Sequence, residues 1–312
     1  MILETLDRAR TLAPDHRIRV LTGRHLLGSM IQATGNPDPS LFLVEPEAKG
    51  TAPVLVWAAW TINRIQPGAV IVSLHADHVI EPVETFQAQM LAAAAAAGEG
   101  TALLTVGVPP TRPETGFGYL LPGAAFPTAG DMEAFRVESF VEKPDSTKAV
   151  RFVEGGYLWN SGLFVWRADL FLDEVRSVAP EIGGLLPLLE EGDVEAFFRE
   201  APPISVDEAV LERSSRMAGV RARFQWDDIG CWEALARTGE PDQDGNVSEG
   251  PTQFVDSRNN IVVSDHGTLV LFGIEDLVVV REGEIVLVAQ RERAAELKSL
   301  LEQLPAELRD PE

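Results

Sequence analysis

The sequence predicts an α/β protein: a doubly wound, mostly parallel Rossmann-like sheet, followed by a small β-rich C-terminal domain that ends in a helix. Two observations carry this prediction. Short apolar runs alternate with helical patterns through residues 1–250. Such strand–helix–strand alternation implies crossover connections, and hence a parallel sheet with helices on both faces. Beyond residue 250 the pattern changes to β-rich runs separated by glycine-containing turns.

Three runs in the first part have the features of buried strands, since each is short, apolar and bounded by Gly, Pro or polar residues. They are "LFLVEP" (41–46), "AVIVSL" (69–74) and "TALLTVGV" (101–108). The segments between them, 51–65 and 82–100, have helical patterns. The second is rich in alanine and has Gly98 where a C-cap belongs. Ligands of such sheets bind beyond the carboxyl ends of the strands, and Asp77 stands at such an end.

The second part follows the loop "GEPDQDGNVSEGP" (239–251), whose composition is typical of an irregular connection. Three Val- and Leu-rich stretches come next and predict strands: "NNIVVS", "GTLVLFG" and "DLVVVREGEIVLVAQ". The final stretch "RERAAELKSLLEQL" (291–304) has apolar residues at helical spacing. We therefore expect one domain over residues 1–250 and a second over 251–312.

The composition excludes several classes of partner. The chain has 48 Asp and Glu against 26 Lys and Arg, a formal charge of −22, which repels nucleic acid and anionic membrane. No apolar run approaches the ~20 residues of a membrane span, and the N-terminus lacks the features of a secretory signal. Cys231 is the single cysteine, so no intrachain disulfide forms. These features predict a cytoplasmic protein.

The motif His75-x-Asp77-His78 raises the question of a metal site. It overlaps part of the H-x-H-x-D-H cluster of zinc hydrolases of the metallo-β-lactamase type. That cluster needs a further histidine where Ser73 stands, and more ligands downstream, where only His266 remains. The ligand count therefore disfavours a zinc hydrolase. The plainest alternative is a strand end with a solvated acid.

Seven stretches in a fixed order decide between these interpretations. They are "EPEAKGTAP" (45–53), "HADHVI" (75–80), "TRPETGFGYL" (111–120), "FVEKPD" (140–145), "LWNSGLFVW" (158–166), "ISVDEAVLE" (204–212) and "WDDIGCWEAL" (226–235). This series resembles the nucleotidyltransferases that make nucleotide sugars, and among them the mannose-1-phosphate guanylyltransferases, also called GDP-mannose pyrophosphorylases. The resemblance covers nearly the whole chain. It implies GTP and mannose 1-phosphate as substrates and Mg²⁺ as cofactor.

The resemblance also implies roles for individual residues. Asp77 and Asp228 would be catalytic and would hold the metal, because the acid directly before "IG" is the family's metal ligand. Lys143 would be catalytic and bind the sugar phosphate as a point charge. The residues that would contact the substrates are Glu45, Pro46, Thr51, Ala52, Gly118, Tyr119, Glu142, Asn160 and Asp207. Carboxylates suit Mg²⁺, a hard ion that prefers oxygen ligands.

Two departures from the family pattern leave alternatives open. The family begins with a Gly-rich phosphate loop, GGxGTRLxPLS, which this sequence does not contain. We expect that the start of the chain is assigned too late, or that the chain is truncated. Lys49 and Gly50 stand where the family commonly has Arg and Asn, in a loop that contacts the base. A pyrophosphorylase for another nucleotide or sugar, or a non-catalytic sugar-nucleotide-binding subunit, therefore remains an alternative, and a homodimer is a candidate assembly.

Overall fold

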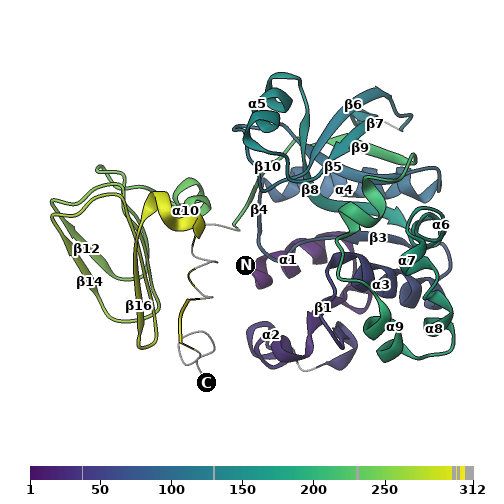
Figure 1. Cartoon of the computed structure of the whole chain (residues 1–312), viewed down its shortest axis with the longest axis horizontal. Helices are drawn as coiled ribbons and strands as arrows, with labels where there is room; N and C mark the ends of the chain where they lie inside the picture. Colours follow the sequence, from purple (N-terminus) through teal and green to yellow (C-terminus); the bar gives the residue numbers. More distant parts are fainter. Residues whose placement is uncertain (37, 129–130, 230–231, 297–299, 301–302, 306–312) are drawn as a thin grey trace. The chain divides into compact units, whose positions relative to one another are not determined.

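The structure is a computed structural model that describes residues 1–312 except 37, 129–130, 230–231, 297–299, 301–302 and 306–312 (Figure 1). The chain divides into two compact units. The first comprises residues 1–76 and 80–226, and the second comprises residues 77–79 and 227–312. The second unit thus begins before the boundary that we expected at residue 251. Cys231 lies outside the described residues.

The helices and strands follow one another along the chain as follows: α1 (Ile2–Leu12), η1 (Asp15–Arg17), β1 (Val20–Gly23), η2 (Arg24–Leu26), α2 (Leu27–Thr34), η3 (Pro39–Leu41), β2 (Phe42–Glu45), α3 (Thr51–Ile65), β3 (Val70–Ser73), β4 (His78–Glu81), α4 (Val83–Gly98), β5 (Leu103–Val108), β6 (Tyr119–Ala125), β7 (Ala134–Val141), α5 (Ser146–Glu154), β8 (Leu158–Arg167), α6 (Ala168–Val178), α7 (Pro180–Gly183), α8 (Leu186–Glu190), α9 (Val194–Glu200), η4 (Asp207–Leu211), β9 (Met217–Arg221), β10 (Gln225–Asp228), α10 (Trp232–Thr238), β11 (Val247–Glu249), β12 (Thr252–Val255), β13 (Ile261–Ser264), β14 (Leu269–Phe272), β15 (Leu277–Glu282), β16 (Ile285–Gln290) and η5 (Arg291–Glu296). The predicted strands and helices of residues 41–108 are confirmed as β2, α3, β3, α4 and β5.

A six-stranded sheet with the order β3-β8-β5-β9-β7-β6 forms the centre of the first unit. Its side chains alternate between two faces, as the strand geometry requires. Leu103 of β5 joins an apolar cluster with α3, α6, α8 and α9, whereas Leu104 and Val106 join a second cluster with α4. Helices therefore cover both faces of the sheet (Figure 1). This doubly covered α/β architecture is the predicted one.

The pairing of the strands corrects one part of the prediction. In this sheet β5 and β9 pair in parallel, whereas β8 is antiparallel to β3, β5 and β6. The strand β7 is also antiparallel to its neighbours β6 and β9. The expectation of mostly parallel pairing was wrong, because it extended the strand–helix–strand rhythm of residues 41–108 to the rest of the domain. The strands β6 and β7 instead follow one another without a crossover helix, and an antiparallel pair allows this.

The second unit contains parallel coils of short strands. The strands β11, β13 and β15 pair in parallel, β12 pairs in parallel with β14, and β16 joins the larger sheet in antiparallel fashion. Asn246 and Asn260 are both buried, and the Asn260 Nδ2 donates to Asn246 Oδ1 at 2.9 Å. Two side-chain amides thereby satisfy buried polar groups where the chain turns between coils.

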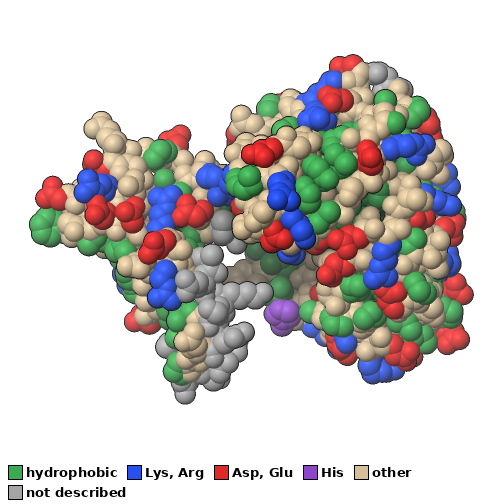
Figure 2. Space-filling model, turned by 45° about the horizontal axis from the view of Figure 1, so that its top comes forward, with side chains coloured by type: hydrophobic (Ala, Val, Ile, Leu, Met, Phe, Trp, Pro, Cys, Tyr) green, Lys and Arg blue, Asp and Glu red, His purple; other side chains and the backbone are tan. Residues whose placement is uncertain are grey.

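Only part of the expected C-terminal helix lies within the described residues. The structure describes residues Arg291–Glu296 as a 3₁₀ helix, and residues 297–299 and 301–302 of the expected helix lie outside the described residues. None of the helices in the described part of the chain is both long and apolar enough to cross a membrane. On the face drawn in Figure 2, Lys and Arg side chains are interspersed with Asp and Glu.

Candidate functional site

A polar cluster in the first unit brings together residues from three elements. Glu142 and Lys143 lie in the turn after β7, Asn160 lies on β8, and Asp207 opens η4. The Asn160 Nδ2 donates to Asp207 Oδ1 at 2.9 Å, and the Lys143 Nζ lies 3.0 Å from Glu142 Oε1. We call these four residues the sugar-side cluster, after the role that the resemblance implies for them. All four are among the residues predicted from the sequence, and they come from three separate motifs.

Lys143 carries the positive charge of this cluster on a strained backbone. Its φ is 43°, a left-handed value that residues other than glycine rarely adopt. Its side chain is 64% exposed, so the ammonium can reach a ligand. The hydrogen bond to Glu142 raises the pKa of Lys143, as do the charges of Glu142, Asp207 and Glu208. Strain that persists at a charged, accessible residue is typical of a functional site.

Asp207 lies at the start of η4, which is a π-helix, a form found frequently at functional sites. Burial, followed by the negative charge of Glu142, raises the pKa of Asp207 to about 7. A carboxyl group with this pKa exists in both protonation states near neutral pH. It can therefore either donate a hydrogen bond to a ligand or accept one.

The segment that leads into Asp207 is tied to the start of α3. Val206 N donates to Thr51 Oγ1 at 2.9 Å, and Ala52 N donates to Ile204 O at 3.2 Å. Thr51 and Ala52, which the sequence analysis assigned to substrate contact, thus position the segment before η4. This contact fixes where Asp207 enters the sugar-side cluster.

Gly118 packs directly against the cluster. A Cβ at this position would lie 2.6 Å from Glu142 Oε2 and 2.9 Å from Phe140 Cζ, so a larger residue here would displace these side chains. The Gly118 carbonyl accepts from Asn160 N at 2.8 Å. The Tyr119 side chain points elsewhere: it is fully buried in the core, packs against Phe152 of α5 and donates to Glu114 O at 2.8 Å. Tyr119 is therefore next to the cluster in sequence, but its side chain belongs to the core.

Glu45 and Pro46 follow β2, which pairs in parallel with β1 so that Glu45 lies opposite Gly23. Burial raises the pKa of Glu45, and the charge of His25 opposes this shift. Among the described side chains, neither Glu45 nor Pro46 forms a hydrogen bond or ion pair with the sugar-side cluster. The loop "EPEAKGTAP" instead contacts the segment before η4 through residues 50–52.

The backbone segments that carry the two predicted metal ligands lie side by side in the second unit. The amide of Ile229 donates to the carbonyl of Asp77 at 3.1 Å, so the backbone at Asp228 runs next to Asp77. The neighbouring acid, Asp227, forms a bidentate ion pair with Arg237, with both distances at 2.8 Å. This ion pair joins Asp227 to α10, and the assignment of Asp228 as a metal ligand stays a prediction.

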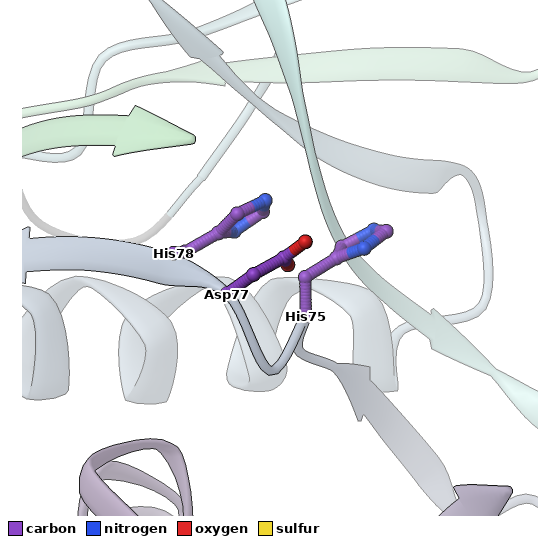
Figure 3. Close-up of side chains that lie close together, drawn as sticks. All are labelled: His75, Asp77 and His78. Atoms are coloured by element: carbon purple, nitrogen blue, oxygen red, sulfur yellow. The ribbon is translucent and has the colours of Figure 1, made fainter. Parts of the chain in front are cut away.

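The turn between β3 and β4 presents a compact set of donor atoms. One ligand atom from each of His75, Asp77 and His78 can be chosen so that all lie within 4.8 Å of one another. Figure 3 shows the Asp77 carboxylate between the two imidazoles. Donor atoms with this spacing can share one cation, whose ligands lie about 2.0–2.6 Å away. The donor set therefore fits a divalent metal: its carboxylate would suit Mg²⁺ or Mn²⁺, and its imidazoles would suit Zn²⁺.

Sequence reasoning missed Thr105, which contacts the sugar-side cluster from the interior of the sheet. Its hydroxyl donates to Asn160 Oδ1 at 2.7 Å, and the residue is fully buried. The signal was visible: Thr105 is the one hydroxyl residue within the apolar run "ALLTVGV" (102–108). A buried hydroxyl in a strand core needs a partner, and here the partner is a residue of the cluster.

Comparison with known proteins shows similarity to two family models and to a solved structure. The model of the nucleotidyl transferase family matches residues 2–244, and a model described as the MannoseP isomerase/GMP-like beta-helix domain matches residues 253–304. The structure of a protein named mannose-1-phosphate geranyltransferase from Thermus thermophilus is 30% identical, with a TM-score of 0.86, over 96% of this chain and 88% of that one. This similarity confirms the α/β fold class with a β-helix-like C-terminal part.

Two curated relatives extend the comparison. The xanthan biosynthesis protein XanB of Xanthomonas campestris pv. campestris (strain B100) is 35% identical over 97% of this chain and 66% of its own length. A mannose-1-phosphate guanylyltransferase of Salmonella montevideo is 31% identical over 99% of this chain and 68% of its own length. This chain thus spans about two thirds of the length of these relatives. With a family model over residues 2–244 and relatives aligned along nearly its whole length, the chain belongs to the nucleotidyl transferase family.

Proposed function

We propose that this chain transfers GMP from GTP to mannose 1-phosphate, giving GDP-mannose and pyrophosphate. The observation that carries the proposal is the sugar-side cluster, in which one accessible cation stands among carboxylates and an amide. Lys143 supplies the charge that a sugar phosphate needs. Glu142, Asn160 and Asp207 supply hydrogen-bond acceptors and a donor for sugar hydroxyls. The name of the Salmonella relative, mannose-1-phosphate guanylyltransferase, supports mannose 1-phosphate and a guanine nucleotide as the substrates.

The reaction requires no covalent intermediate on the protein. A phosphate oxygen of mannose 1-phosphate forms a bond to the α-phosphorus of GTP, and the bond to the bridging oxygen of the leaving pyrophosphate breaks. Catalysis then consists of alignment and charge neutralisation. Lys143 orients the attacking phosphate and reduces its repulsion from the triphosphate. Asp77 and Asp228 would hold Mg²⁺, which would stabilise the charge that develops on the leaving pyrophosphate.

Turnover measurements test the proposal directly. Phosphorus NMR would follow GTP with mannose 1-phosphate and Mg²⁺, and parallel reactions would replace GTP by ATP, CTP or UTP and mannose 1-phosphate by glucose 1-phosphate. We expect GDP-mannose and pyrophosphate in equal amounts, and slower turnover with the other pairs. Faster turnover with a different pair would reassign the substrates within the same reaction class.

The main competing function is a non-catalytic subunit that binds a sugar nucleotide. It predicts that GDP-mannose binds with measurable affinity while no pyrophosphate forms with any substrate pair. Calorimetry with GDP-mannose beside the turnover assay separates the two functions. Binding without turnover would favour the subunit, and the absence of both would contradict either function.

A further inference from the structure

Thr105 and Asn160 connect the interior of the central sheet to the sugar-side cluster. Thr105 lies on β5 and is 0% exposed, and Asn160 lies on the neighbouring strand β8 and is 8% exposed. The Thr105 hydroxyl lies 2.7 Å from Asn160 Oδ1 and 3.4 Å from the carbonyl of Leu163. The shorter distance identifies the amide oxygen as the main acceptor of its single proton.

The two ends of the Asn160 amide therefore have different partners. Its oxygen accepts from Thr105, and its nitrogen donates to the Asp207 carboxylate at 2.9 Å. The backbone of Asn160 is fixed separately, because its N–H donates to Gly118 O at 2.8 Å. What Thr105 controls is thus the rotation of the side-chain amide. Without a donor at its oxygen, this buried amide would keep an unsatisfied acceptor or rotate away from Asp207.

We propose that Thr105 is a positioning residue of the sugar-side cluster: its buried hydroxyl holds the Asn160 amide in the orientation that presents Nδ2 to Asp207. A rigid amide–carboxylate pair has its donors and acceptors in place before a polyol ligand arrives. The ligand then does not have to order these groups itself, which strengthens binding. The identity of the ligand as a sugar phosphate rests on the proposed function, whereas the role of Thr105 in fixing the amide does not.

Thr105→Val tests the inference, because valine has nearly the same shape as threonine but no hydroxyl. Thr105→Ser keeps the hydroxyl and serves as the rescue variant. Ser161→Ala is the matched control: Ser161 is also buried beside Asn160, but its hydroxyl donates to the carbonyl of Val106 at 2.8 Å. Thermal melts establish that each variant is folded, and Thr105→Ala is a second hydroxyl-free variant if the valine variant does not fold.

The first measurement is the ¹⁵N-edited NMR spectrum of the Asn160 side-chain amide, assigned by its absence in Asn160→Asp. We expect the two amide protons to shift and broaden in Thr105→Val, and to remain as in the parent in Thr105→Ser and Ser161→Ala. The second is the affinity for mannose 1-phosphate, which should fall about tenfold in Thr105→Val, as for one lost hydrogen bond in a binding site. The turnover number should change less than about twofold, because the proposed function assigns the Asn160 amide to sugar hydroxyls and not to the reacting phosphate.

The outcomes separate the inference from the proposed function. An unchanged amide spectrum in folded Thr105→Val would overturn the positioning role, whatever the ligand. A changed spectrum, with a parent protein that binds no sugar phosphate, would support the positioning role and contradict the proposed substrate. Equal loss of affinity in Thr105→Val and Ser161→Ala would also overturn the inference, since the loss would then reflect general packing of the two strands.

Discussion

At the residue scale, the cluster rests on one cation surrounded by acids. Lys143 forms a hydrogen bond with Glu142 and interacts electrostatically with Asp207 and Glu208. This arrangement keeps the ammonium protonated and fixes its position, but it also holds several negative charges close together. The surrounding carboxylates would repel an anionic ligand. Direct contact with the Lys143 ammonium therefore has to supply the attraction.

The first prediction concerns Lys143. Lys143→Ala should weaken binding of mannose 1-phosphate by about 1.5–3 kcal/mol, the range for a hydrogen bond to a charged group, as measured by calorimetry. Lys143→Gly should weaken binding equally, but its free energy of unfolding in urea should be about 1 kcal/mol higher than that of Lys143→Ala, since glycine adopts the φ of 43° without strain. Unchanged affinity in both folded variants would remove Lys143 from the site.

The second prediction concerns the metal ligands. Asp228→Asn should reduce the affinity for Mn²⁺, followed by electron paramagnetic resonance, by at least about tenfold, because one of two carboxylate ligands is lost. Asp227→Asn is the matched control, since it removes the same charge from the adjoining residue, whose partner is Arg237. If the two variants bind Mn²⁺ equally well, Asp228 is not a ligand. A larger loss in Asp227→Asn would exchange their roles.

At the element scale, the position of η4 depends on the loop before α3. Gly50 has φ +80° and lies so close to the next segment that a Cβ would stand 2.6 Å from Ile204 O. On the other side of this contact, Ile204 N donates to Lys49 O at 3.0 Å, and Val206 N donates to Thr51 Oγ1. These contacts of the loop thereby fix the position of η4 relative to the cluster.

The third prediction follows from this contact. Gly50→Ala should destabilise the protein by about 3 kcal/mol or more, because the unfavourable φ adds to a clash with backbone that cannot move aside. Gly156→Ala is the control, since Gly156 has φ +76° and no atom within 4 Å of the added Cβ. This control should cost only about 1 kcal/mol. Urea unfolding measures both, and equal losses would show that the Ile204 contact is easily relieved.

At the scale of the whole molecule, the proton on Asp207 links the cluster to the stability of the fold. Its pKa is about 7 in the folded protein, above the ordinary value near 4. The folded state therefore holds a proton that the unfolded state releases between these values. The stabilising contribution is fully present below about pH 4 and is lost as the pH rises through about 7.

The fourth prediction tests this linkage. As the pH is raised from about 5 to about 8, the melting temperature of the parent should fall more than that of Asp207→Asn. The parent has to ionise a buried carboxyl group at position 207, whereas the asparagine variant has no such group. Glu208→Gln removes the same charge from the exposed neighbouring residue and should follow the parent. Differential scanning calorimetry across this range measures the three proteins. Parallel curves for all three would contradict the raised pKa.

The sequence by itself determined the types of β2, α3, β3, α4 and β5, but not the strand β4, and it identified the four cluster residues through their motifs. Apolar periodicity is a local property, so α3 begins and ends at the residues that the pattern predicted. The motifs around Lys143, Asn160 and Asp207 contain charged and polar residues next to apolar runs. Such residues are costly to bury without a partner, so their presence there indicated a site. Periodicity cannot show which strands pair, and the antiparallel insertion of β8 between β3 and β5 was therefore not foreseen.

Only the tertiary structure decided which polar residues touch. Thr105 and Asn160 are 55 positions apart, and their hydrogen bond exists because β5 and β8 are neighbours in the sheet. Tyr119, which the motif placed beside the site, turns its side chain into the core because alternate residues of a strand face opposite sides. Asp227 and Arg237 are ten positions apart, and the fold brings their side chains into a bidentate ion pair. These contacts join residues that are distant in sequence, and their geometry is set by packing rather than by local pattern.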